Sequence, residues 1–137
     1  MEIAALEAGD EDRVVAAEHL FDGPADAEAT RRFLATDGHH LLVAYIDGVA
    51  AGFVSGVEMT HPDKGTEMLV YEVAVDERYR NRGVARALLE ELKSIARSRG
   101  CYGMWVLTND SNKAALAAYI SAGAVREGEH VMLGWRL

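Results

Sequence analysis

The sequence predicts one domain of the α/β (α+β) class, with helices packed on a mixed β-sheet. In the first half of the chain, apolar runs of strand length flank a two-residue turn signal. The second half alternates short apolar runs with two segments of helical periodicity. At 137 residues, 50% of them hydrophobic and 26% charged, the chain is long enough to bury a core. No repeat or low-complexity linker divides it, so residues 1–137 are expected to form a single domain.

The first half is expected to contain two helices and a hairpin. Asp10 is a candidate N-cap for the first helix, which should end at Asp22-Gly23-Pro24. Asp47-Gly48 is typical of a two-residue hairpin turn. The elements expected here are a strand at 3–8, helices at about 10–21 and 25–36, and strands at 40–46 and 49–57.

The second half is expected to alternate strands and helices. Its clearest element is a helix at 84–99, because apolar residues recur there at steps of three and four up to Gly100. Gly123 similarly ends a helix at 112–122. The other elements expected here are a polar loop at 60–66 and strands at 68–75, 104–107 and 131–136.

The net charge of −8 is divided unevenly along the chain. Residues 1–79 contain 17 acidic and 5 basic side chains, whereas residues 80–137 contain 5 acidic and 9 basic ones. This asymmetry favours one anionic and one cationic ligand, although surface charge for solubility explains the acidic part equally well. Nucleic acid is disfavoured as a partner, because the basic residues gather at one turn instead of spreading over a face.

The sequence gives little support for a membrane helix, a disulfide framework or a metal site. No apolar run approaches the roughly 20 residues of a membrane helix, and Met1-Glu2-Ile3 lacks the basic start of a signal peptide. Cys101 is the single cysteine, which fits a reducing cytoplasm and a small buried side chain. The five histidines show no metal-ligand spacing. We therefore expect a cytoplasmic protein with no metal and no membrane partner, and the sequence leaves a homodimer open.

The turn at residues 80–86 carries the most specific functional signal. A helix N-terminus has free N–H groups and a partial positive charge, so acidic neighbours are favoured there. Arg80, Arg82 and Arg86 stand there instead. Gly83 lies among them, and glycine lets the backbone approach a ligand. Because helix-terminal amides bind phosphate, the turn is predicted to cradle a pyrophosphate, although the Walker-type and dinucleotide-binding glycine patterns are absent.

Two motifs resemble those of the GCN5-related N-acetyltransferase (GNAT) superfamily. Arg80-x-x-Gly83-x-Ala85, after Tyr71-Glu72-Val73-Ala74-Val75, is similar to motif A of that superfamily. Asn112-x-x-Ala115-x-x-x-Tyr119, followed by Gly123, is similar to motif B. The resemblance covers nearly the whole chain. It implies the GNAT fold, a mostly antiparallel central sheet splayed between its fourth and fifth strands, with about four flanking helices.

The resemblance also implies that acetyl-CoA is the co-substrate and lies in the splay of the sheet. The strand before the turn would face the pantetheine arm, Asn112 would hydrogen-bond the pantetheine amides, and the turn would hold the pyrophosphate. The residues so assigned to acetyl-CoA are Val73, Ala74, Val75, Arg80, Asn81, Arg82, Gly83, Val84, Ala85, Arg86, Asn112 and Tyr119.

Tyr119 and Glu72 are the candidate catalytic residues. Asn112 and Tyr119 lie on one helical face about 10 Å apart, and family analogy makes the Tyr119 phenol the acid that protonates the departing thiolate. The alternative is an amphipathic core tyrosine. Glu72 interrupts an apolar strand, where a carboxylate costs free energy unless it is paired, solvated or functional. It is a candidate base or ligand for the attacking amine, and the alternative is a glutamate on the wet face of the sheet.

The acetyl acceptor is expected to be a cationic amine. The run from Thr66 to Ala85 most resembles aminoglycoside 3-N-acetyltransferases, which carry an acidic residue at the position of Glu72. This implies acetyl transfer to an aminoglycoside antibiotic, a role in resistance, and a fit between the substrate and the acidic residues 1–79. The expected substrate contacts are Glu67, Glu72 and Asp110, with Glu58 and Asp63 on or near the same side.

Other functions stay open at this point. Residues 109–112, Asn-Asp-Ser-Asn, depart from the aminoglycoside enzymes, and Asp110 is also a candidate helix cap. Peptide and ribosomal-protein N-acetyltransferases share the Asn112 pattern and are the first alternative. A non-catalytic domain that only binds acetyl-CoA is the second.

Overall fold

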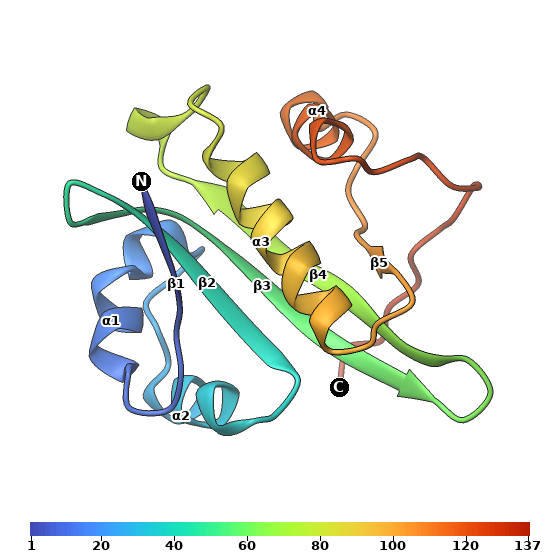
Figure 1. The fold of residues 1–137 in the computed structure, drawn as a ribbon, viewed down its shortest axis with the longest axis horizontal. Helices are drawn as coiled ribbons and strands as arrows, with labels where there is room; N and C mark the ends of the chain where they lie inside the picture. Colours follow the sequence, from blue (N-terminus) through green and yellow to red (C-terminus); the bar gives the residue numbers. More distant parts are fainter.

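The computed structural model describes residues 1–137 as one five-stranded sheet with helices on both faces (Figure 1). The strands lie in chain order; the first four are antiparallel, and the fifth runs parallel to the fourth. This arrangement confirms the predicted mixed α/β fold. The strands are β1 (Glu2–Ala5), β2 (His39–Ile46), β3 (Val49–His61), β4 (Gly65–Val75) and β5 (Met104–Trp105).

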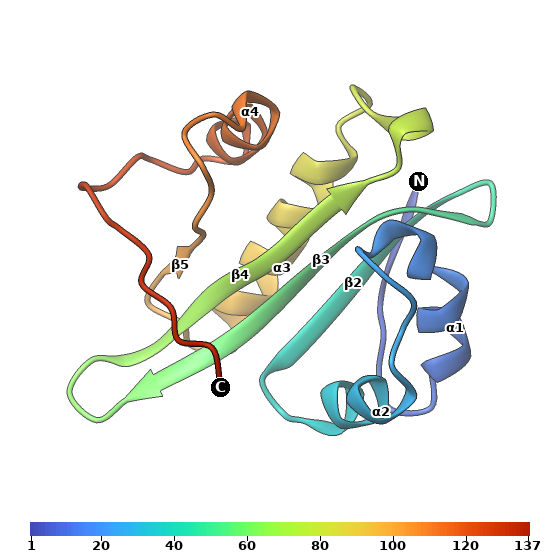
Figure 2. The same ribbon diagram turned by 180° about the vertical axis from the view of Figure 1, so that it is seen from behind.

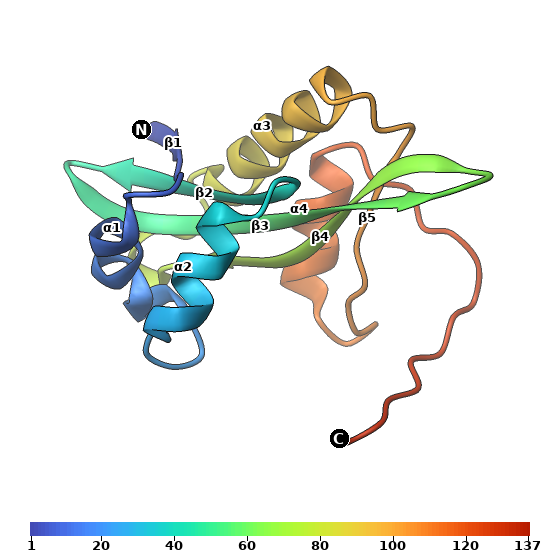
Figure 3. The same ribbon diagram turned by 90° about the horizontal axis from the view of Figure 1, so that it is seen from below.

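Helices cover the sheet unequally. The first two helices lie on one face and the long third helix on the other, as the view from below shows (Figure 3). The fourth helix lies beside the third (Figure 1). The helices are α1 (Glu11–Ala16), α2 (Ala27–Ala35), α3 (Val84–Ser98) and α4 (Lys113–Ser121), with single 3-10 turns η1 (Glu18–Leu20) and η2 (Glu77–Tyr79).

The sheet separates two apolar cores. In β2, Leu41 and Val43 pack toward α1 and α2, whereas Leu42 and Ala44 pack toward α3. This follows from the period of two in a strand, which sends successive side chains to opposite faces. Because both faces are covered, β2 is apolar at successive positions.

α3 packs closely on the sheet through the predicted stripe. Leu88 and Leu92 are completely buried, and the stripe begins at the buried Val84. Gly56 of β3 makes room for it, because a Cβ on this residue would lie 2.9 Å from a methyl carbon of Leu92. The position of α3 fixes where its N-terminus, and hence the arginine-rich turn, meets the end of β4.

A β-bulge in β4 determines which side chains face which core. Ser55 of β3 pairs with Glu72 and Gly56 pairs with Val70, so Tyr71 has no partner across the ladder. One extra residue reverses the alternation of side chains along the strand. Glu72 therefore faces α1 and α2, although a regular strand would turn it toward α3.

β4 and β5 separate after a short contact. Only Met68 and Leu69 pair with β5, opposite Met104 and Trp105. Beyond this point β4 and the segment that follows β5 diverge, toward the end where α3 begins (Figures 1 and 2). The splay that the GNAT resemblance implied is therefore present, and residues 70–75 have no strand beside them on this edge.

Some predicted elements differ in detail, whereas the hairpin turn agrees with the structure. The helix expected at 10–21 divides into α1 and η1, and Asp10 makes no side-chain cap. The loop expected at 60–66 is largely strand, because β3 runs to His61 and β4 begins at Gly65. The Asp47-Gly48 turn is confirmed, and both residues have the positive φ values, 50° and 78°, that a two-residue hairpin turn requires.

The strand predicted at 131–136 is wrong for the single chain. Residues 124–137 form neither helix nor strand, and Val131, Met132 and Trp135 are exposed. No strand of the same chain lies against them, so their backbone has no ladder to join. None of the helices combines the length and apolarity that a membrane crossing would require.

Candidate functional site

The turn between β4 and α3 is preformed by local bonds. The Asp76 carboxylate accepts the backbone N–H of Arg78 at 2.9 Å and two guanidinium bonds from the same residue at 3.1 and 2.9 Å. These side-chain bonds are the main reason that the pKa of Asp76 falls to about 2. Further along, Asn81 and Gly83 adopt left-handed conformations, with φ of 61° and 77°, which turn the chain into the helix.

The N-terminus of α3 is open to an anion. Gly83 offers no side chain to cap the helix, and the first helical bond joins the Ala87 N–H to the Gly83 carbonyl at 3.0 Å. The N–H groups of Val84, Ala85 and Arg86 therefore have no intrahelical partner. No acidic residue occupies the first turn, and a Cβ on Gly83 would meet no atom within 4 Å. The predicted phosphate cradle fits this geometry, because free amides and the helix dipole favour a negative charge.

The exposed edge of β4 leads from the splay to this cradle. The Asp76 N–H donates to Ala51 of β3 at 2.8 Å, so the backbone groups of Val75 and Val73 point the other way, toward the splay. The Val75 carbonyl accepts the Arg80 Nε–H at 3.2 Å. The structure thus brings Val73 and Val75 to the predicted binding edge, whereas the backbone of Ala74 faces β3.

α4 carries the motif B residues on the far side of the splay. Asn112 caps this helix, and its Oδ1 accepts the Ala115 N–H at 3.1 Å. The NH₂ group of the same side-chain amide is left to donate to a ligand. Asp110, the other candidate cap, does not cap α4; its carboxylate pairs with the Arg126 guanidinium at 2.5 Å. Tyr119 is half-buried against the α3-side core, and burial raises the pKa of its phenol. Its hydroxyl therefore stays protonated and able to donate.

Glu72 lies on the opposite wall, on the face covered by α1 and α2. Partial burial raises the pKa of its carboxyl, and the negative charge of Asp22 raises it further. Asp22 follows η1, fifty residues earlier in the chain, and sequence reasoning used it only as a helix terminator. No local pattern indicates this pairing, because it depends on how the η1–α2 connection lies over the sheet. Two carboxylates here make the site attractive to a cation.

The other expected acidic contacts do not join Glu72. Glu58 faces α3, where His40 Nε2 lies 2.6 Å and Arg99 Nε 2.5 Å from its carboxylate, so its charge is already neutralised. Glu67 accepts the Tyr102 hydroxyl at 3.0 Å and lies about 16 Å along β4 from Glu72, at ~3.3 Å per residue. Asp63 lies in the β3–β4 turn and binds His61 and Lys64.

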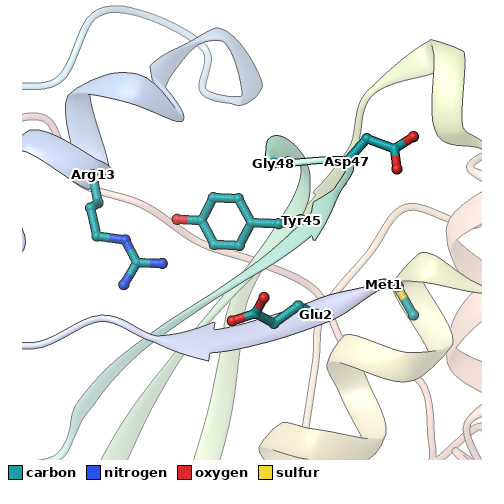
Figure 4. A pocket seen from close by; sticks show the side chains of 6 residues that line it. All are labelled: Met1, Glu2, Arg13, Tyr45, Asp47 and Gly48. Atoms are coloured by element: carbon teal, nitrogen blue, oxygen red, sulfur yellow. The ribbon is translucent and has the colours of Figure 1, made fainter.

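A separate hollow of about 560 Å³ lies at the opposite edge of the sheet (Figure 4). Tyr45 points its hydroxyl toward Arg13 there, and the guanidinium lies 5.1 Å from the ring centre. Glu2 and Asp47 add negative charge to its rim. Because β1 and β5 are the two outer strands, this hollow belongs to neither the splay nor the cradle.

Comparison with known proteins decides the family. The model of the acetyltransferase (GNAT) family matches residues 8–124. The chain belongs to this family. GNAT acetyltransferases use acetyl-CoA, and the free amides of the cradle and the unpaired edge of β4 fit this co-substrate.

Curated GNAT relatives include several N-acetyltransferases. The N-alpha-acetyltransferase RimI of Mycobacterium tuberculosis is 34% identical over 107 residues, which cover 78% of this chain and 65% of the relative. N-acetyltransferase 8 of Rattus norvegicus is 27% identical over 107 residues, which cover 77% and 48%. The chain therefore spans about half to two thirds of the length of these relatives.

Solved GNAT structures share the fold at low identity. An aminoglycoside acetyltransferase from an uncultured soil sample, in complex with sisomicin, has a TM-score of 0.91 and 17% identity, covering 99% of this chain and 95% of that one. The aminoglycoside N-acetyltransferase AAC(6′)-Iy in complex with CoA has a TM-score of 0.79 and 18% identity, covering 99% and 100%. A ribosomal-protein-alanine N-acetyltransferase from Brucella melitensis has a TM-score of 0.78 and 20% identity, covering 98% and 100%.

Proposed function

We propose that this GNAT protein transfers the acetyl group of acetyl-CoA to a primary amine of a cationic small molecule, an aminoglycoside. The observation that carries the proposal is the acidic wall of the splay, where Glu72 lies half-buried with Asp22 close enough to raise its pKa. Burying a carboxylate is costly unless a cation or a proton compensates it. An ammonium group of the acceptor supplies that compensation.

The residues divide the chemistry between the two walls. When bound, acetyl-CoA supplies an activated acetyl group as a thioester. Glu72 accepts a proton from the acceptor ammonium, directly or through water, so that the nitrogen lone pair is free to attack. Its raised pKa makes it a stronger base than an ordinary glutamate. On the other wall, the protonated Tyr119 donates its hydroxyl proton to the sulfur that leaves.

Binding groups surround this centre. The amides of Val84, Ala85 and Arg86 hold the pyrophosphate, and Arg80 and Arg82 add positive charge. Val73 and Val75 offer backbone groups to the pantetheine arm, much as an edge strand accepts another strand. The side-chain amide NH₂ of Asn112 remains as a donor at the start of α4.

The position that is acetylated is a further part of the proposal. The sequence resemblance favours the 3-amino group of the aminoglycoside, whereas AAC(6′)-Iy among the structural neighbours is of the 6′ type. Fragment masses of the acetylated product distinguish these two amines, because they stand on different rings. A product acetylated only at the 6′ position would contradict the 3-N assignment.

A second candidate acceptor is the N-terminal amine of a peptide or ribosomal protein. It is favoured by sequence, since the RimI relative is 34% identical over most of this chain. The Escherichia coli [Ribosomal protein bS18]-alanine N-acetyltransferase is 40% identical over 57 residues, which cover 42% of this chain and 38% of the relative. Such an acceptor carries one amine near the site instead of several.

A substrate panel tests these proposals. The purified protein is mixed with acetyl-CoA and either aminoglycosides, simple polyamines or peptides that begin with alanine, and release of free CoA is followed with a thiol reagent. Thiol release with aminoglycosides, and a mass increase of one acetyl group on the antibiotic, is the expected result. Release only with peptides would make the N-terminal amine of a peptide the acceptor, in place of the aminoglycoside. Acetyl-CoA binding without release in any mixture would leave a non-catalytic module.

A further inference from the structure

Residues 106–137, which include α4, have one hydrogen bond to the rest of the chain. Their other backbone and side-chain hydrogen bonds stay among themselves. The single bond to residues 1–105 comes from Lys93 of α3, whose ammonium donates to the Ala122 carbonyl at the end of α4, at 2.9 Å. The two helices that it joins lie side by side (Figure 1).

The Ala122 carbonyl has no other donor in the chain. Gly123 follows it in a left-handed conformation, with φ of 95°, so the helix stops there and its last carbonyls lack an intrahelical N–H. No backbone N–H donates to the Ala122 oxygen. An ammonium is favoured at this position, because the C-terminus of a helix carries a partial negative charge. Lys93 therefore satisfies an end of α4 that the backbone leaves open.

Lys93 is held for this contact by its own helix. Its side chain is 27% exposed, and its ammonium lies 3.0 Å from the carboxylate of Glu90, which precedes it by three residues on α3. An ion pair of this spacing within one helix adds little to stability. The bond to Ala122 is different, because it is charge-assisted, about twice as strong as a neutral hydrogen bond, and joins two separate helices.

Tyr119 lies just before this bond, on the same face of α4. Tyr119 and Ala122 are three residues apart, the spacing that places side chains on one helical face, and both contact the α3-side core. Along the helix axis they are about 4.5 Å apart, at about 1.5 Å per residue. α4 has no buried residue to hold it. The place of Tyr119 beside the splay therefore depends on a short contact whose one hydrogen bond comes from Lys93.

We infer that Lys93 is a positioning residue, which anchors α4 to α3 and so holds the Tyr119 hydroxyl where the sulfur leaves. The inference rests on the proposed function, because it requires Tyr119 to act as the acid. Lys93 acts through α4, since its ammonium already has two acceptors, the Glu90 carboxylate and the Ala122 carbonyl. Catalysis is sensitive to such placement, because a displacement of about 1 Å can cost about 100-fold in rate.

The first test measures α4 directly and needs no acetyl acceptor. Lys93→Met keeps the length of the side chain and removes the ammonium. In hydrogen–deuterium exchange of the full chain, read by mass spectrometry, the amides of residues 113–121 should exchange about 10- to 100-fold faster, while those of 84–98 keep their rates. Glu90→Gln is the matched control, because it removes the ion pair and leaves the bond to Ala122. Unchanged exchange in Lys93→Met, or equal increases in both variants, would overturn the anchor.

The second test separates positioning from packing. In the thiol-release assay, Lys93→Met should lower kcat by about 10- to 100-fold and change the KM for acetyl-CoA by a smaller factor, because the cradle and the β4 edge lie outside α4. In a Tyr119→Phe background the same substitution should change kcat by less than about twofold, since the group that it positions is gone.

The outcomes of this second test are distinct. Equal losses of kcat in the two backgrounds would mean that Lys93 acts elsewhere, and would overturn the positioning role. No thiol release by the unaltered protein with any acceptor would overturn the proposed function and the part of Lys93 in catalysis with it. The exchange measurement would then still support or overturn the anchor between α3 and α4.

Discussion

Residues 1–100 and residues 101–137 differ in how much of their surface the chain itself covers. Every buried residue lies at or before Ala96, in the two cores around the sheet. After that point α4 has no buried residue, and β5 is only two residues long. The first region is therefore a complete scaffold. The second is a set of parts that the chain itself leaves largely exposed.

The difference separates stability from chemistry. The scaffold holds the cradle and Glu72 in place through buried contacts, whereas Tyr119 projects from a helix that the scaffold holds weakly. Elements that bind ligands are often drawn from the less stable part of a fold. Substitutions in α4 should therefore alter catalysis more than unfolding, whereas substitutions in the two buried cores of the first region should do the reverse.

The largest expected effect is on catalysis. Tyr119→Phe should lower kcat by about 10²–10⁴-fold, the usual contribution of a general acid. The ring remains, so the unfolding free energy and the affinity for acetyl-CoA should change little. Steady-state kinetics and calorimetric titration measure the two quantities. An unchanged kcat would remove Tyr119 as the acid and assign the residue to packing.

The next effect is on stability. Leu92→Ala should lower the free energy of unfolding by about 3 kcal/mol, because it opens a cavity between α3 and the sheet. Ile120→Ala is the matched change in the second region. It should cost less than about 0.5 kcal/mol, since Ile120 is 61% exposed. Urea unfolding followed by circular dichroism compares them, and equal losses would break the proposed contrast.

A smaller effect is expected at the cradle. Arg82→Glu should weaken acetyl-CoA binding by about 10- to 100-fold, as the loss of one charge-assisted contact is worth about 1.5–3 kcal/mol. Arg97→Glu carries the same charge change to the other end of α3 and serves as the control. Calorimetric titration gives both affinities. If the two variants bind equally well, the positive charge at the cradle does not contribute to recognition.

The smallest effect concerns the pH profile. The base acts when deprotonated, so the raised pKa of Glu72 places the acid limb of kcat/KM at a higher pH than an ordinary glutamate would. Asp22→Asn removes a neighbouring negative charge, lowers the pKa of Glu72 and should shift this limb by a fraction of a pH unit toward acid. Glu72→Gln should abolish the limb and lower kcat/KM most at pH values above it, where the carboxyl of the unaltered protein is deprotonated. A limb that stays in place in both variants would assign the titration to another group.

The sequence predicts well where local chemistry decides the structure. The Asp47-Gly48 turn and the apolar stripe of α3 are confirmed, because neighbouring residues determine the turn conformation and the helical period. The cradle could be found for the same reason. Glycine and arginine at the start of a helix conflict with its usual preferences, and the structure shows a helix end without a side-chain cap.

Prediction fails where partners are distant in the chain or outside it. The pairing of β3 with β4 extends through the polar residues 58–67, because backbone bonds in a hairpin need no apolar side chains. Asp22 approaches Glu72 only after η1 has packed on the sheet. Glu58 was assigned to the substrate, but the alternation of β3 turns it toward Arg99 instead. The strand expected at 131–136 has the right pattern and no partner within one chain.

The unpaired residue Tyr71 has a consequence for comparing related sequences. Val70 pairs with Gly56 and Glu72 pairs with Ser55, so Tyr71 is the one residue that the ladder skips. A relative that lacks this residue can keep every strand pair, with the glutamate still on the side of α1 and α2. An alignment that omits the gap would instead match Glu72 to a residue that faces α3, because successive residues of a strand point to opposite faces. Two chains of this family can therefore differ by one residue in β4 and still present the same side chains to both cores.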